Sequence, residues 1–168
     1  MLSCVYVEAG IRQHPRTEKL LARLRHLPLV EIEHYGEVFN PRAQNFRLQK
    51  KNPALIIAAK NKGHILTTPE GYGLGGKHNY YFSHMLNCVY DCRYCFLQGM
   101  FQSAHQLLFV NYEDFADGID DVAQQHADQP VWFYSGYDCD SLAYDPMTGF
   151  ADYFIPRVKS IDNAWMEL

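Results

Sequence analysis

Apolar and polar residues alternate along residues 5–8, which favours a short strand. A helix is predicted next, because Pro15 is tolerated in a first turn and apolar residues then recur at helical spacing before Pro28. The apolar positions of this stripe are Leu20, Leu21, Leu24 and Leu27. Residues 29–33 alternate again, and residues 54–59 form an apolar run typical of a buried strand. The pattern predicts a small α/β module at the start of the chain.

The second half of the chain has the order strand, loop, helix, strand, loop, helix. Residues 78–84 and 107–110 favour strands, and residues 112–125 favour a helix with a regular apolar stripe. The apolar run at residues 131–134 is typical of a parallel strand covered on both faces, and residues 149–158 begin another helix. This order predicts βα repeats, in which functional groups gather where strands end.

Four glycines between residues 71 and 76 separate the two patterns. Their spacing matches a nucleotide-binding fingerprint, but that fingerprint requires a helix next, and residues 78–86 favour a strand. We interpret the glycines as a joint between an α/β module at residues 1–76 and the first βα units of a barrel at residues 77–168. Because two βα units cannot close a barrel, we expect the chain to be an incomplete piece of a larger protein, inactive by itself.

The composition is that of a folded globular protein, since 48% of the 168 residues are hydrophobic and 20% are charged. No apolar run approaches the roughly 18 residues of a membrane span, and the chain start lacks the basic segment of a signal peptide. Five cysteines, three of them closely spaced, argue against a secreted disulfide framework. We predict a cytoplasmic protein with no membrane partner.

Charge is distributed unevenly along the chain. Residues 1–93 hold 13 Lys and Arg against 7 Asp and Glu, whereas residues 94–168 hold 2 against 12. Between residues 38 and 68 there is no acidic residue. The cations of this stretch are Arg42, Arg47, Lys50, Lys51, Lys60 and Lys62. They either contact the phosphate backbone of a nucleic acid or form a solvated basic face.

Three cysteines in the pattern Cys-x3-Cys-x2-Cys carry the most specific chemistry of the chain: Cys88, Cys92 and Cys95. A 4Fe–4S cluster held by three thiolates keeps one iron open to a further ligand, whereas a structural zinc ion takes four protein ligands. A zinc site is therefore an alternative, with its fourth ligand supplied by Cys139, His84 or His105. Three unconnected buried thiols are a second alternative.

The triplet, with Tyr94 in its aromatic position, resembles the signature of radical S-adenosylmethionine (SAM) enzymes. In that superfamily the open iron binds the amino and carboxylate groups of SAM, and reductive cleavage yields a 5′-deoxyadenosyl radical. Beyond the triplet, the chain resembles the spore photoproduct lyase family over essentially its whole length. The matching segments are residues 45–51, 69–72, 86–100 and 135–149.

This resemblance implies a partial (β/α) barrel that binds a 4Fe–4S cluster and SAM, takes an electron from a reducing donor and acts on DNA. The family's named enzyme repairs a thymine dimer photolesion by hydrogen abstraction, so we expect a DNA-repair lyase. The loop expected to contact SAM contains Ser135, Gly136, Asp138, Asp140 and Ser141. Either aspartate can pair with the SAM amino group or cap the segment that follows.

Cys139 and Tyr94 are the expected hydrogen donors. Family members have a tyrosine after the third cysteine, but this chain has Phe96, which lacks a hydroxyl. Cys139 stands about two residues from the family's donor cysteine, and a donor thiol must reach the product radical. These departures favour a radical SAM enzyme of other specificity as one alternative. A non-catalytic zinc or iron–sulfur module that binds nucleic acid is the other.

Overall fold

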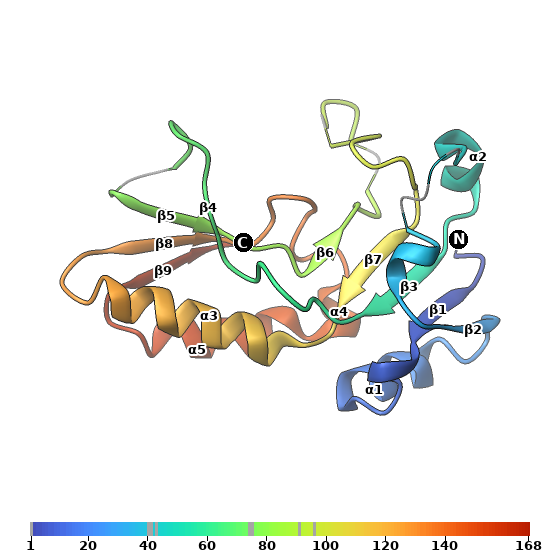
Figure 1. Ribbon diagram of the computed structural model, residues 1–168, viewed down its shortest axis with the longest axis horizontal. Helices are drawn as coiled ribbons and strands as arrows, with labels where there is room; N and C mark the ends of the chain where they lie inside the picture. Colours follow the sequence, from blue (N-terminus) through green and yellow to red (C-terminus); the bar gives the residue numbers. More distant parts are fainter. Residues whose placement is uncertain (1, 40–41, 43, 74–75, 91, 96) are drawn as a thin grey trace. The chain divides into compact units, whose positions relative to one another are not determined.

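The structure is a computed structural model that describes residues 2–39, 42, 44–73, 76–90, 92–95 and 97–168 (Figure 1). The chain forms two compact units. The first unit contains residues 1–59 and 85–110, and the second contains residues 60–84 and 111–168. No helix among the described residues is both long and apolar enough to cross a membrane.

The first unit is built on a five-stranded sheet in the order β2-β1-β3-β7-β6. Four strands run parallel, and β6 pairs antiparallel with β7. The strands are β1 (Val5–Glu8), β2 (Leu29–Ile32), β3 (Leu55–Ala58), β6 (Met85–Leu86) and β7 (Gln106–Phe109). Every residue of β3 is buried, as expected for a central strand of a parallel sheet.

Two helices accompany this sheet, α1 (Pro15–Arg23) and α2 (Phe46–Lys51), together with single 3-10 turns at Ala9–Ile11 and Tyr35–Glu37. The ring of His14 caps α1 by accepting a hydrogen bond from the Arg16 backbone at 3.2 Å. Buried Glu8 ends β1 and accepts backbone hydrogen bonds from Tyr35 at 2.8 Å and Ala59 at 3.0 Å. Glu8 therefore ties two later segments to the first strand.

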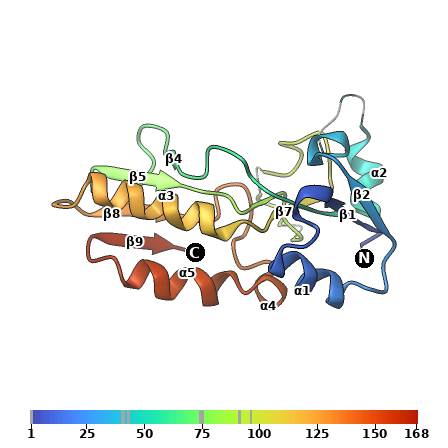
Figure 2. The same cartoon turned by 60° about the horizontal axis from the view of Figure 1, so that its bottom comes forward.

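The second unit is built on a four-stranded sheet in the order β4-β5-β8-β9. β5, β8 and β9 run parallel, and β4 pairs antiparallel with β5. The strands are β4 (Leu66–Thr67), β5 (His78–Tyr81), β8 (Val131–Tyr134) and β9 (Ala164–Glu167). The helices are α3 (Tyr112–Gln125), α4 (Asp145–Thr148) and α5 (Phe150–Lys159). Figures 1 and 2 show α3 and α5 side by side along one face of the sheet.

The core of the second unit is an aromatic cluster beneath its sheet. Phe82 follows β5 and lies 5.4 Å from the ring of Phe154 and 5.9 Å from that of Phe115. Phe150 packs 4.6 Å from Phe154, and all four rings are fully buried. Gly149 separates α4 from α5 at a positive φ of 64°, which glycine adopts at little cost. Burial of these four rings is expected to stabilise the unit.

Several predicted elements have the predicted bounds, notably β1, β8 and α3. The strand predicted over residues 78–86 is wrong as one element, because β5 ends at Tyr81 and β6 joins the other sheet. The helix predicted to continue to Pro28 ends at Arg23, and no helix was predicted where α2 forms.

The compact units differ from the division predicted at residues 76 and 77, because β7 hydrogen-bonds to β3 within one sheet. That division stays a prediction about domain organisation. The predicted glycine joint includes Leu74 and Gly75, which lie outside the described residues.

Candidate functional site

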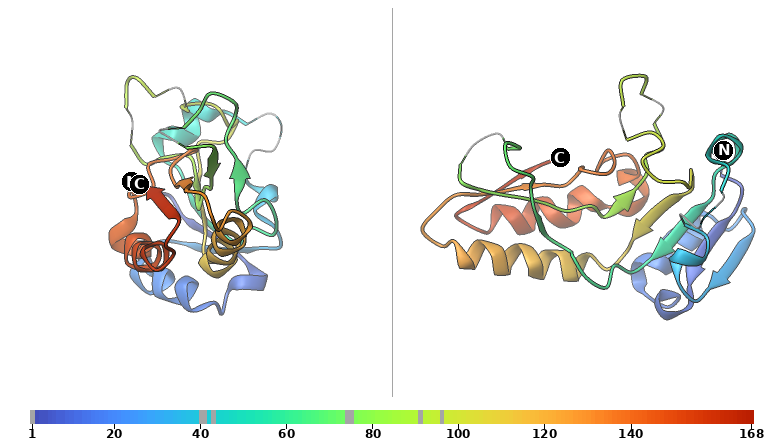
Figure 3. Two further views of the ribbon diagram at one scale, coloured as in Figure 1. Left: turned by 90° about the vertical axis from the view of Figure 1, so that its left-hand side faces the viewer. Right: turned by 45° about the horizontal axis from the view of Figure 1, so that its top comes forward.

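The three cysteines lie on one loop of the first unit, which joins the antiparallel strands β6 and β7 (Figure 3). Leu86 pairs with Leu107 at the base of this loop. Cys88, Cys92 and Cys95 all have free thiols, and each is partly exposed. We call residues 87–105 the cysteine loop.

Asn87 fixes the base of the cysteine loop. Its side-chain amide donates to the carbonyl of Ser103 at 2.8 Å and to that of His105 at 2.7 Å. Its φ is 61°, in the left-handed region that asparagine tolerates better than most residues. Asn87 therefore joins the two ends of the loop one residue before the first cysteine.

Replacing Asn87 is expected to destabilise the first unit in two separable ways. Asn87→Gly keeps the positive φ but removes both amide hydrogen bonds, at a cost of about 1–3 kcal/mol. Asn87→Ala adds the left-handed backbone strain of about 1–2 kcal/mol. Urea unfolding of the metal-free protein measures both. An Asn87→Gly variant as stable as the wild type would show that the amide does not hold the loop.

Cys92 and Cys95 are joined by a turn in which the Cys95 backbone donates to the Cys92 carbonyl at 3.0 Å. Tyr94 lies within that turn and is 90% exposed. Its hydrogen bond with Cys92, and the negative charge that this thiol carries when ionised, raise the pKa of Tyr94. The predicted hydrogen donor Tyr94 is thus a neighbour of a predicted cluster ligand.

The donor chemistry fits an iron–sulfur cluster, because three free thiols share one loop. Among the described residues, however, no three His, Cys, Asp or Glu side chains lie close enough together to hold a metal ion. The ligand roles of Cys88, Cys92 and Cys95 therefore stay a prediction. Asp91 and Phe96, which also belong to the cysteine loop, lie outside the described residues.

A cavity of about 190 Å³ lies against the cysteine loop within the first unit. Cys88 and Cys95 line it together with Phe46 and Lys50 from α2 and with Gln98. Asn45 precedes the helix α2, and its side chain caps the helix by accepting a hydrogen bond from the Leu48 backbone at 3.1 Å. The cysteine loop and the basic helix α2 therefore lie next to each other and line the same cavity.

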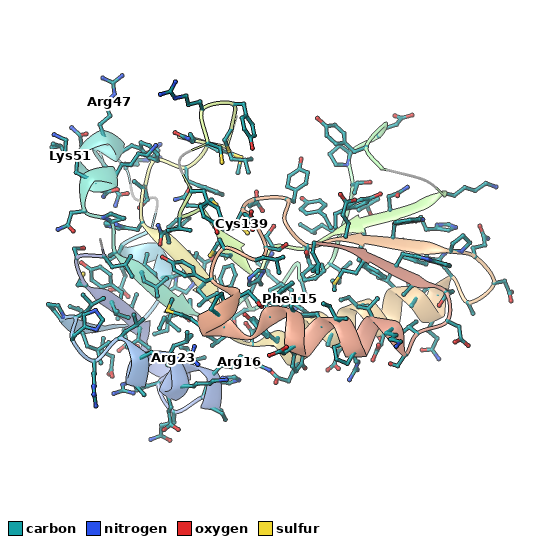
Figure 4. The ribbon with its side chains drawn as sticks, turned by 180° about the vertical axis from the view of Figure 1, so that it is seen from behind. Arg16, Arg23, Arg47, Lys51, Phe115 and Cys139 are labelled. Atoms are coloured by element: carbon teal, nitrogen blue, oxygen red, sulfur yellow. The ribbon has the colours of Figure 1, made fainter. Side chains whose placement is uncertain are left out.

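The six predicted nucleic-acid-binding cations are divided between the two units. Four of them belong to the first unit and are exposed, and Figure 4 shows Arg47 and Lys51 projecting from α2. Lys60 and Lys62 belong to the second unit. Lys60 is half-buried, 5.7 Å from the centre of the Phe115 ring, and burial lowers its pKa against the opposing charge of Asp138. A direct contact between Lys60 and DNA is therefore disfavoured.

The predicted SAM loop, residues 135–141, follows β8 in the second unit, where Ser83 pairs with Gly136. Ser135 is fully buried, and its hydroxyl donates to the Glu167 carbonyl at 2.9 Å. A Cβ atom at Gly136 would lie 2.9 Å from the Cys139 carbonyl, so only glycine fits there. The predicted donor Cys139 is 4% exposed.

The two aspartates of this loop have different partners. Asp138 accepts a hydrogen bond from the Ser83 hydroxyl at 2.5 Å, and Asp140 accepts one from the Leu142 backbone at 2.9 Å. Asp140 therefore caps the segment that follows, as one of the two sequence-based alternatives proposed. The hydroxyl of Ser141 is buried and has no partner among the described residues. Ser141 is thus the loop residue with an unsatisfied polar atom.

The two histidines considered as zinc ligands differ in their contacts, and Nδ1 of His84 is buried without a hydrogen-bond partner among the described residues. His84 is 1% exposed and stacks on Phe150 with 4.0 Å between ring centroids. Burial lowers the pKa of His84 to about 3, so the ring is neutral at physiological pH. Nδ1 of His105 accepts a hydrogen bond from the Ala54 backbone at 3.0 Å. Neither ring belongs to a group of metal-binding side chains among the described residues.

No family model matches the sequence, and no curated protein matches it at a significant level. Solved structures of spore photoproduct lyase do match. A variant with bound AdoMet and dinucleoside spore photoproduct superposes with a TM-score of 0.82 at 15% identity. A tyrosine-to-phenylalanine variant gives 0.81 at 16%, and a complex with dinucleoside spore photoproduct gives 0.80 at 17%. Each comparison covers 99% of this chain.

The chain has the fold of spore photoproduct lyase. It spans about half the length of the spore photoproduct lyase structures, since 48% of each of those chains is covered. The mixed α/β fold with parallel sheets, predicted as the first part of a radical SAM barrel, is confirmed. At this low identity, the similarity to spore photoproduct lyase establishes the fold alone. Any catalytic chemistry has to be argued from the residues of this chain.

Sequence reasoning missed Asn87 and Gln98, which shape the cysteine loop of the first unit. It also missed Ser83, which contacts the loop at residues 135–141 in the second unit. Asn87 carried a usable signal, because asparagine is enriched at positive φ and stands next to the cysteine triplet. Gln98 donates to the Cys92 carbonyl at 2.9 Å, and Ser83 binds Asp138. Both contacts join residues whose proximity depends on how a loop closes.

Proposed function

We propose that this protein is a radical SAM enzyme of the spore photoproduct lyase type, which repairs a thymine dimer photolesion in DNA. The observation that carries the proposal is the presence of three free thiols on one loop, closed by Asn87, within the spore photoproduct lyase fold. Three matched structures hold dinucleoside spore photoproduct, and one of them also holds AdoMet. Because this chain covers only 48% of those structures, its substrate and its activity are both part of the proposal.

In this proposal Cys88, Cys92 and Cys95 hold a 4Fe–4S cluster, and the loop at residues 135–141 binds SAM. The cluster and SAM together supply a 5′-deoxyadenosyl radical, using an electron from a reducing donor. The unpartnered Ser141 hydroxyl supports a ligand role, because buried polar atoms normally have a hydrogen-bond partner. The contacts described above would hold the SAM loop in its conformation. They are made by Ser135, Gly136, Asp138 and Asp140.

Hydrogen return would involve Cys139 and Tyr94. Cys139 is buried, so its thiol would be shielded from solvent oxidants, whereas Tyr94 is exposed and hydrogen-bonded to Cys92. The exposed cations of α2, with Arg42, would bind DNA phosphates. Cytoplasmic location is part of the proposal, because free thiols and a reducing electron donor suit that compartment.

Phe96 supports a second candidate function, a radical SAM enzyme of other specificity. Phenylalanine has no O–H group, so it cannot relay hydrogen at the position where the family has tyrosine. The 5′-deoxyadenosyl chemistry would be retained in this candidate, and the substrate would differ.

The deciding experiment is anaerobic reconstitution of the full-length protein with iron, sulfide and SAM, followed by chemical reduction. We expect cleavage of SAM to 5′-deoxyadenosine and conversion of dinucleoside spore photoproduct to the undamaged dinucleoside. SAM cleavage with untouched photoproduct would replace the first candidate with the second. Bound zinc without sulfide would reject both candidates in favour of a non-catalytic nucleic-acid-binding module.

A further inference from the structure

A chain of two hydrogen bonds leads from the basic helix α2 to a predicted cluster ligand. The ammonium of Lys50 donates to Oε1 of Gln98 at 2.7 Å. Nε2 of the same Gln98 side chain donates to the backbone carbonyl of Cys92 at 2.9 Å. Because Lys50 occupies the oxygen of the amide, the nitrogen of Gln98 faces Cys92. The Lys50 contact therefore fixes the orientation in which Gln98 can hold the cysteine loop.

The carbonyl of Cys92 accepts a second hydrogen bond, from the Cys95 backbone at 3.0 Å. This bond closes the turn that spaces two of the three cysteines. Gln98 and Cys95 thus bind the same oxygen, one from outside the turn and one from within it. Fixing this carbonyl fixes the direction of the Cys92 peptide and the separation of the two cysteines along the loop.

The helix α2 contacts the far end of the cysteine loop as well. Oε1 of Gln49 accepts from the Ala104 backbone at 3.0 Å and from the Ser103 hydroxyl at 3.4 Å. Lys50 is the next residue, and its ammonium lies 6.0 Å from the centre of the Phe46 ring and binds Gln98. Neighbouring residues of one short helix therefore bind the loop at two places, which limits how far it can move.

We propose that Lys50 and Gln98 are positioning residues that hold the Cys92–Cys95 turn in one conformation for cluster binding. We call this pair of contacts the Lys50–Gln98 latch. The proposal rests on the proposed function, because it assigns the turn to cluster binding. It also gives Lys50 a role separate from DNA binding, which was the role expected of every cation in the basic stretch.

The latch has an electrostatic consequence for a bound cluster. Lys50 and the cysteines Cys88 and Cys95 line one cavity, so the ammonium stands beside the predicted cluster position. A positive charge near an iron–sulfur cluster favours its reduced, more negative form. Lys50 therefore raises the reduction potential of the cluster, and Lys50→Met lowers it.

Hydrogen exchange in the metal-free protein tests the latch without any cluster. We expect Lys50→Met and Gln98→Met each to speed exchange of the Cys95 amide about three- to tenfold, the effect of losing one net hydrogen bond. The double variant should exchange no faster than Gln98→Met alone, because the two contacts act in series. Lys51→Met is the matched control, since it removes the same charge from the same exposed helix.

Rescue and redox measurements separate positioning from a general loss of structure. Lys50→Arg keeps the donor and the charge, so its exchange rate and its cluster potential should approach those of the wild type. Exchange in Lys50→Met that equals exchange in Lys51→Met overturns the latch. So does a cluster potential in Lys50→Met that is unchanged from the wild type.

Failure of the proposed function has a different outcome. If the wild-type protein takes up no iron and sulfide, there is no ligand set to position, and the proposal falls with the proposed function even where exchange is faster. If the wild type takes up both and the latch variants behave as Lys51→Met does, only the latch is rejected. Iron and sulfide content of the wild type therefore tells the two failures apart.

Discussion

Replacing any one of Cys88, Cys92 and Cys95 with alanine is expected to abolish binding of a 4Fe–4S cluster. A cluster with three protein thiolates has no spare protein ligand, so loss of one leaves two irons without a protein contact. After anaerobic reconstitution, iron and sulfide should fall from a full cluster in the wild type to background in each variant. The brown chromophore should disappear with them.

Cys139→Ala and Cys4→Ala are the matched controls for this experiment, because both cysteines lie outside the cysteine loop. Both variants should retain the full iron and sulfide content. Loss of iron in Cys139→Ala alongside the triplet variants would indicate a four-ligand site and contradict the open-iron account. Retention of a cluster in any triplet variant would contradict the assignment of that ligand.

Acid is expected to destabilise the second unit through His84. Burial alone lowers the pKa of His84 from 6.5 to about 3. Below pH 6.5 the unfolded chain therefore binds a proton that the folded ring rejects, and stability falls as the pH drops toward 3. The linkage slope of about 1.4 kcal/mol per pH unit predicts a loss of about 2 kcal/mol by pH 5.

His84→Phe should flatten this pH dependence, because phenylalanine can stack on Phe150 and has no titrating nitrogen. Urea unfolding at pH 7 and pH 5, followed by a signal from the second unit, gives the measurement. His26→Phe makes the same chemical change at an exposed position and should keep the wild-type slope. An unchanged slope in His84→Phe would remove His84 as the cause of the acid sensitivity.

The elements that were predicted correctly are those whose buried positions can be identified from the spacing of apolar residues in the local sequence. Residues 131–134 are continuously apolar and form a parallel strand, and the apolar spacing of residues 112–125 matches the buried face of α3. The short helix α2 was missed because its apolar Leu48 is exposed and most of its other residues are polar or charged. Only the Asn45 cap marked it locally.

The candidate site was predictable as a set of thiols and not as a structure. Cysteine spacing alone indicates an iron–sulfur site, whereas the contacts of Asn87, Gln98 and Lys50 depend on loop closure across many residues. His84 looked available to a metal because sequence does not show that Phe150, far along the chain, covers its ring. Burial of that kind depends on tertiary packing.

The central claim is that the cluster keeps one iron open for SAM. Electron paramagnetic resonance of the anaerobically reconstituted and reduced protein tests it most directly, with spectra recorded before and after addition of SAM. The account predicts a 4Fe–4S signal whose shape changes when SAM binds the open iron. A signal that SAM leaves unchanged, or a protein that binds only zinc, would contradict it.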